Sequence, residues 1–216
     1  MKTQIKKMAR TGAALLFAAM LSIPASKAEN PNPEFEFLKQ RDGIDLYYRW
    51  MEMPGGKSVR QMKAVLELDG CANDVLNLLK DESRALDWIP SAEQFRHLTT
   101  TDGTEWASYI QFSVPWPFAD QDCIMAYSAH WEADSSLVID FECKPEFIDP
   151  VDGITRMKDI VGSFVIKPGE KGRCAMECYF LSKKASRIPK WITEPIVTGN
   201  ILNLVNAIRV ELSPKA

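Results

Sequence analysis

The sequence predicts an α+β fold in which a curved antiparallel sheet wraps around one long C-terminal helix and encloses a hydrophobic cavity. Two observations carry this prediction. Strand-like segments follow one another through hairpin-like turns, which join antiparallel neighbours. A single long amphipathic segment with helical spacing then ends the chain. Because one helix covers only part of a strongly curved sheet of seven or eight strands, the remaining space is either filled by large side chains or left as a cavity.

The first 28 residues are typical of a secretory signal peptide that is removed after Ala28. Basic residues come first, an apolar run at residues 11–23 follows, and small residues precede the expected cleavage site. The apolar run is too short for a stable membrane span. An amphipathic N-terminal anchor that stays in place is the alternative. The pattern predicts an exported protein, periplasmic in a bacterial envelope, with a single domain at residues 29–216.

The charge of that domain argues against nucleic acid as a partner. The whole chain has 26 basic and 29 acidic residues, and the first 28 residues hold five basic and no acidic ones. Their removal changes the net charge from −3 to −8, which disfavours adsorption to a polyanion. The remaining length suits one domain with a sizeable core, and we expect a monomer.

The five cysteines form no paired zinc-binding pattern; they are Cys71, Cys123, Cys143, Cys174 and Cys178. An oxidising compartment permits disulfides, and the odd number leaves at least one thiol free unless two chains pair. Cys174 and Cys178 lie roughly 13 Å apart along one expected strand, so they cannot bond to each other. Buried small apolar residues are the simpler interpretation.

The first half of the domain predicts a hairpin followed by two short helices. Residues 43–50 and 59–68 alternate as strands on either side of a turn at residues 53–57. Residues 71–80 carry apolar side chains at helical spacing. Residues 81–88 form a second short helix, which Pro90 ends.

The second half predicts hairpin-linked strands and then the long helix. The expected strands are residues 95–100, 105–114, 122–132, 137–144, 154–166 and 173–181. Asp102-Gly103 is a strong signal for the turn between the first two. The helix covers residues 188–212, with Pro195 as a kink or a second start.

Six motifs, in this order, resemble the START domain, the lipid-transfer fold related to steroidogenic acute regulatory protein. They are Asp42-Gly43-Ile44-Asp45-Leu46-Tyr47-Tyr48-Arg49, Trp88 after the two short helices, Pro115-Trp116-Pro117-Phe118 with Asp122, Gly162-Ser163-Phe164 with Pro168, Ile188-Pro189-Lys190-Trp191, and Ile208-Arg209. The resemblance covers most of residues 29–216. It implies a helix-grip (START/Bet v1-like) fold that holds a lipid in its cavity, and together with the signal pattern it implies an exported bacterial START protein.

One residue departs from the family at the proline-tryptophan-proline corner. Gln121 stands where the family usually has an arginine between two acids. Glutamine can form hydrogen bonds but lacks the permanent charge and the guanidinium fork. If the family's arginine braces the two acids or reaches a ligand head group, the departure puts that role in doubt here. Phe164 replaces a more usual tryptophan.

The candidate ligand-binding residues are the large apolar side chains that share one face of each strand or helix, together with Gln121. They are Trp106, Ile110, Phe112, Gln121, Met125, Tyr127, Ile139, Phe141, Met176, Phe180, Ile201, Val205 and Ile208. Plain core packing is the alternative for every apolar member. The polar candidates for a ligand head group are Gln121, Asp122, Arg156 and Asp159.

The sequence predicts no catalytic residues, no metal ligands and no cofactor. Both histidines, His97 and His130, fall in strand-like segments without metal-ligand spacing, which favours structural or surface roles. Asp120 and Asp122 could form an acid–base pair, but acids at a strand start commonly cap the turn. The hydrolase elbow, the phosphate loop and the dinucleotide fingerprint are absent from the sequence.

The function predicted from these features is binding, and possible transfer, of a lipid or other hydrophobic small molecule in the cell envelope. A cyclase- or aromatase-like enzyme and an interaction module without a ligand are the alternatives. A basic cluster before the last helix could contact a membrane surface, with a solvated loop as the alternative. It comprises Lys183, Lys184, Arg187, Lys190 and Trp191.

Overall fold

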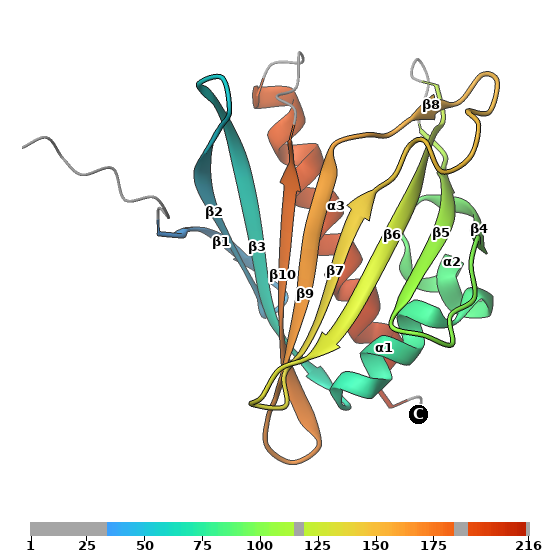
Figure 1. Cartoon of the computed structure of the whole chain (residues 1–216). Helices are drawn as coiled ribbons and strands as arrows, with labels where there is room; N and C mark the ends of the chain where they lie inside the picture. Colours follow the sequence, from blue (N-terminus) through green and yellow to red (C-terminus); the bar gives the residue numbers. More distant parts are fainter. Residues whose placement is uncertain (1–33, 115–118, 184–189, 215–216) are drawn as a thin grey trace, which may run out of the picture. The chain divides into compact units, whose positions relative to one another are not determined.

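Ten strands form one sheet in the described part of the computed structural model, which comprises residues 34–114, 119–183 and 190–214 (Figure 1). The strands are β1 (Glu36–Arg41), β2 (Ile44–Met53), β3 (Lys57–Asp69), β4 (Ala92–His97), β5 (Glu105–Phe112), β6 (Gln121–Trp131), β7 (Leu137–Cys143), β8 (Thr155–Arg156), β9 (Ile160–Pro168) and β10 (Arg173–Ser182). The expected signal peptide lies outside the described residues.

The strand order is β1-β2-β3-β10-β9-β7-β6-β5-β4, and neighbours on this path are antiparallel. The pairing of β3 with β10 joins strands far apart in the sequence. Helices α1 (Ala72–Lys80) and α2 (Ala85–Trp88) carry the chain from β3 to β4 at the far edge. Hairpins alone therefore do not account for the sheet.

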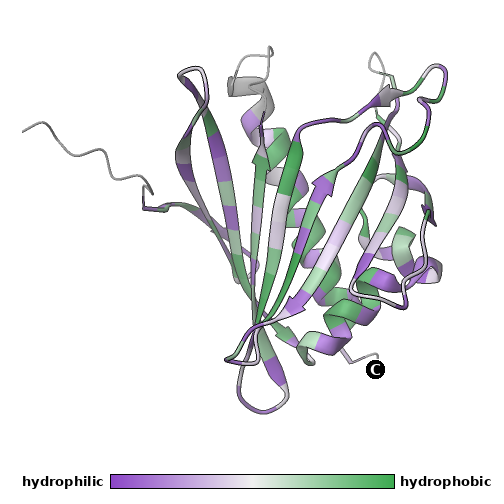
Figure 2. Cartoon of the chain, in the orientation of Figure 1, coloured by the Kyte–Doolittle hydropathy of each residue, from purple (hydrophilic) through white to green (hydrophobic). Residues whose placement is uncertain are grey.

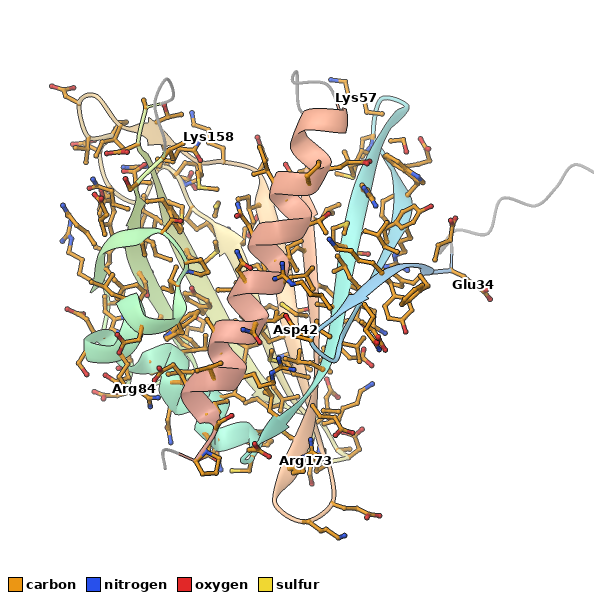
Figure 3. All side chains as sticks on the ribbon, turned by 180° about the vertical axis from the view of Figure 1, so that it is seen from behind. Glu34, Asp42, Lys57, Arg84, Lys158 and Arg173 are labelled. Atoms are coloured by element: carbon orange, nitrogen blue, oxygen red, sulfur yellow. The ribbon has the colours of Figure 1, made fainter. Side chains whose placement is uncertain are left out.

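Helix α3 (Lys190–Leu212) lies against one face of the curved sheet (Figures 1 and 3). We call this face the inner face and the opposite one the outer face. Along β3, Met62, Ala64, Leu66 and Leu68 are buried, and apolar and polar residues alternate along several strands in Figure 2. This period of two gives each strand one apolar face, which α3 and the first two helices cover. The predicted α+β helix-grip architecture is confirmed.

The prediction of a single strand at residues 154–166 is wrong, because the structure has two strands there, β8 and β9. β8 pairs in parallel with the start of β6, and the Met157 N–H donates to the Asp122 carbonyl at 2.7 Å. Asp159 then adopts a left-handed backbone with φ of 65°, and β9 begins at the next residue. This turn interrupts the alternation on which the sequence prediction relied.

The edges of the sheet also differ from the prediction. β1 was not expected, and it lies at an edge with four of its six side chains exposed, so its sequence lacks the apolar alternation of a covered strand. β4 begins at Ala92, before the expected start at Phe95. The unexpected strands β1 and β8 raise the strand number from the expected seven or eight to ten in the described residues.

A buried ion pair fastens the loop between β7 and β8 to the outer face. Arg156 Nε and Nη2 donate to the two carboxylate oxygens of Asp122 at 2.7 and 3.0 Å. Arg156 Nη1 also donates to the carbonyls of Pro145 and Ile148 at 2.8 and 3.0 Å. Both side chains are almost fully buried. These contacts satisfy the guanidinium, so Asp122 and Arg156 stabilise the loop and face away from α3.

Replacing Asp122 by Asn should lower the free energy of unfolding by roughly 3 kcal/mol, because the charge of Arg156 would stay buried without a counter-charge. Urea unfolding followed by circular dichroism measures the effect. Asp140→Asn, at an exposed outer-face position of β7, is the matched control and should change stability little. Equal effects of the two substitutions would contradict this account.

Candidate functional site

Five aromatic side chains from five neighbouring strands form a continuous row across the inner face. This aromatic row consists of Trp106 (β5), Tyr127 (β6), Phe141 (β7), Phe164 (β9) and Phe180 (β10). Trp106 and Tyr127 are stacked at 4.9 Å, and the next ring centroids are 5.1 to 6.4 Å apart. These separations suit favourable aromatic pairs. Burial raises the pKa of the Tyr127 hydroxyl, so the row is uncharged at neutral pH.

Gly162 makes the middle of the row possible. It lies opposite Phe141 on one side and Phe180 on the other, and the Phe141 ring occupies the space that its missing side chain leaves. A Cβ atom there would lie 2.4 Å from Phe141 Cζ and 2.0 Å from the Tyr179 carbonyl oxygen. Cross-strand aromatic rings over a glycine are a known way to stabilise a sheet.

The other predicted apolar site residues lie in the same cluster. Ile110, Met125, Ile139 and Met176 are buried on the inner face, and Phe112 packs partly buried against them. From α3, the buried residues Ile201, Val205 and Ile208 face this surface. The structure therefore brings the predicted apolar residues together. Contact with a ligand stays a prediction for each of them.

Several residues of this surface are not among the predicted site residues. Phe164 belongs to the aromatic row, and Leu46, Met62 and Leu66 extend the cluster onto β2 and β3. The alternation of apolar residues in these segments predicts a hairpin, but it does not specify which face the helix covers.

Helix α3 is held to the rest of the domain by polar contacts along its C-terminal part. Arg41 Nη2 donates to Asn203 Oδ1 at 2.7 Å. Arg84 Nη2 lies 2.7 Å from Glu211 Oε2. Between these contacts, Val205 and Ile208 are fully buried. The helix from Ile201 onward is therefore a fixed part of the core.

The first turns of α3 are less firmly attached. Ile196 and Val197 are 56% and 46% exposed, and Pro195 lacks the N–H that would continue the helical hydrogen bonds. Arg60 of β3 reaches this part of the helix, with its Nη1 atom 2.8 Å from Glu194 Oε1. This segment has the features of a lid that can move.

Described residues line at least two hollows, and neither of these two has a residue of α3 in its lining. The larger of the two, about 450 Å³, is lined by Trp106, Tyr127 and Phe141 of the aromatic row, by Phe147, and by Ala107, Ala126 and Ser128. Alternation along the strands places the last three side chains on the outer face. The smaller, about 220 Å³, adjoins the start of α1 and Trp131. The inner face supplies the walls of the predicted cavity, and the cavity itself stays a prediction.

The two histidines have the structural and surface positions predicted for them. His97 Nε2 lies 3.0 Å from the Lys80 carbonyl, which can only accept, so Nδ1 accepts from the Ser108 hydroxyl at 2.9 Å. Ser108 has no exposed surface, so this pair joins α1 to the sheet without access for a substrate. His130 pairs with Glu132 in solvent. Among the described residues, no group of three acidic, His or Cys side chains could hold a metal ion.

All five cysteines are free thiols. Cys123, Cys143, Cys174 and Cys178 are buried, as the interpretation of small apolar residues requires, and Cys71 is exposed at the start of α1. Burial raises the pKa of Cys178 and raises that of Cys174 to about 11, which keeps both thiols protonated.

Comparisons with known proteins agree on the fold. No protein-family model matches the sequence. An uncharacterised protein of Pseudomonas aeruginosa is 19% identical over 176 residues, which are 82% of this chain and 85% of that protein. The crystal structure of a STAR-related lipid transfer protein from Xanthomonas axonopodis superimposes with a TM-score of 0.72 and 22% identity, over 82% of this chain and 98% of that one.

Two human structures superimpose as well. The lipid transfer and protein localization domain of StarD13 has a TM-score of 0.68 at 16% identity, over 84% of this chain and 90% of that one. StAR-related lipid transfer protein 5 has a TM-score of 0.65 at 10% identity, over 82% and 86%. The chain has the START fold.

The motifs that suggested START have specific places in this fold. Asp42 and Gly43, with φ of 52° and 72°, form the tight turn between β1 and β2. Gly162 and Phe164 belong to the inner face. The Pro115-to-Phe118 corner and Ile188-Pro189 lie outside the described residues. Gln121 begins β6 half-buried, and its proposed effect on head-group recognition stays a prediction.

Replacing Gly162 by Ala should destabilise the protein by about 2–3 kcal/mol, because the added methyl collides with backbone and with the Phe141 ring. The same substitution at Gly199 of α3, where the space is open, should instead stabilise it by about 0.5–1 kcal/mol. Thermal unfolding measures both. A neutral Gly162→Ala variant would show that the aromatic row adapts freely.

Proposed function

We propose that the protein binds a lipid or another hydrophobic small molecule between the inner face of the sheet and α3, and transfers it within the cell envelope. The observation that carries the proposal is the aromatic row, an uncharged apolar surface facing a helix whose first turns are weakly attached. The START fold supports it, because several proteins with this fold are described as lipid transfer proteins.

The energetics show which step such a protein must control. Moving a sixteen-carbon chain from water to an apolar site is worth roughly 12 kcal/mol at about 0.8 kcal/mol per methylene. A lipid that starts in a bilayer gains almost none of this, because its tail is already in an apolar environment. Opening of the entrance and head-group contacts therefore decide the rate of exchange.

Export and membrane contact are also part of the proposal. The N-terminal signal pattern supports export. Within the described residues, no helix combines the length and apolar character of a membrane span. Lys183 of the basic cluster shares Glu142 with Lys144, and hydrogen bonds from Lys144 and Lys183 lower the pKa of Glu142 to about 2. Membrane contact would thus rest on Ile196 and Val197 more than on Lys183.

The basic cluster is only partly described. Lys184 and Arg187 lie outside the described residues, as do the side chains of Lys190 and Trp191. Their contact with a membrane surface stays a prediction from the sequence.

Mass spectrometry of an organic extract from purified protein should find a lipid in stoichiometric amount. Val205→Trp, on the buried side of α3, should fill the ligand space and leave a folded protein with an empty extract. Val210→Trp, at a valine that is 58% exposed on the same helix, should retain the lipid. Empty wild-type extracts together with an unfolded Val205→Trp variant would indicate a filled core and an interaction module.

Replacing Pro195 by Ala should slow lipid transfer between vesicles several-fold, because it restores a helical hydrogen bond and stiffens the first turns of α3. The equilibrium affinity for lipid should change little. Transfer of a fluorescent lipid between donor and acceptor vesicles measures the rate. A transfer rate equal to that of the wild type would contradict a moving lid.

A further inference from the structure

Arg60 of β3 faces the first turns of α3, and only some of the hydrogen-bond donors of its guanidinium have partners within the described part of the chain. It has the same strand parity as Met62 and Ala64, so it lies on the face that α3 covers. Figure 3 shows Lys57, near the start of β3, beside the first turns of α3. The guanidinium lies 4.3 Å from the centre of the Tyr48 ring, and the side chain is 16% exposed.

The donors of this guanidinium are used unevenly. Nη1 contacts Glu194, whereas Nε is buried and has no hydrogen-bond partner among the described residues. Arg156 shows the contrast, because its Nε, Nη1 and Nη2 atoms all donate to carboxylate or carbonyl oxygens. A buried donor without an acceptor is destabilising, so the Nε atom of Arg60 has an unused capacity to bind an acceptor such as a ligand oxygen.

The chemistry of the missing acceptor follows from the shape of the guanidinium. Carboxylates and phosphates bind arginine through two parallel hydrogen bonds, and the edge that carries Nε is one of the edges suited to this. Tyr48 covers one face of the group, and Glu194 contacts its Nη1 atom. A ligand whose anionic head group lies at the Nε edge would place its tail along the apolar inner face.

We propose that Arg60 binds the anionic head group of an acyl lipid through its Nε edge, and that this head group competes with Glu194 for the guanidinium. The inference rests on the proposed function and names its ligand class: a single acyl chain with a carboxylate or phosphate head. Because Glu194 belongs to the weakly attached turns of α3, loading of the ligand weakens the contact between lid and sheet.

The experiment compares palmitate with methyl palmitate, which has the same tail and no charge, on protein freed of lipid with a hydrophobic resin. Arg60→Gln should weaken palmitate binding by about tenfold or more and change methyl palmitate binding little. Arg96→Gln, which removes an arginine from the outer face over Tyr109, is the matched control and should affect neither ligand. Titration calorimetry gives the dissociation constants.

Three further measurements complete the test. Glu194→Gln should tighten palmitate binding several-fold, because the competing carboxylate is gone; weaker binding would contradict the competition. Palmitoyl lysophosphatidate tested beside palmitate tells a phosphate head from a carboxylate head. Acetate and inorganic phosphate should not bind at comparable concentrations, and tight binding of either would contradict a lipid source.

The outcomes separate this inference from the proposed function. Equal binding of palmitate and methyl palmitate, unchanged by Arg60→Gln, would overturn the head-group site and leave hydrophobic ligand binding intact. Failure of both to bind, with empty extracts from the native protein, would overturn the proposed function itself.

Discussion

The packing of α3 against the inner face of the sheet is the contact on which the other features depend. Ile201, Leu202, Val205 and Ile208 are buried there, in one hydrophobic cluster with inner-face side chains of the sheet, and α3 contacts β2, β3 and the two short helices. An antiparallel sheet with one apolar face must cover it, and the sheet is too wide for one helix. Helices α1 and α2 cover part of the remainder. The aromatic row fills further space with rings that carry no charge.

The division of α3 into a firm and a loose part follows from its sequence. The buried stripe begins at Thr198 and continues to the end of the helix, whereas the residues from Glu194 to Val197 are exposed. Pro195 weakens the helical hydrogen bonds within the loose part. A binding site for an apolar molecule needs both parts, since a fixed core maintains the fold while a movable segment admits the ligand.

The strands and the last helix were predictable because each obeys a single periodicity over many residues. The edge strand β1 was not, since few of its residues are buried, and β8 was not, since Asp159 breaks the alternation between two short segments. The burial of the apolar candidates on one face of the sheet was also predictable from parity, and their contact with a ligand stays a prediction. Asp122 and Arg156 could not be placed, because an ion pair on the outer face and a head-group site on the inner face use the same residue types. The partners of Arg60 depend on how α3 crosses β3, and no local sequence pattern specifies that crossing.

The four buried thiols have a consequence for how the chain reaches its native state under the proposed export. β3 and β10 lie far apart along the chain, so their pairing is a non-local event of the kind that makes folding slow. Until that pairing forms, Cys174 and Cys178 of β10 are open to solvent and, in an oxidising compartment, to oxidants. Incorrect disulfides formed in this interval would hold the sheet open. Under the proposed export, pairing of β3 with β10 thus competes kinetically with thiol oxidation. A holding chaperone or a reductase would raise the yield of native protein.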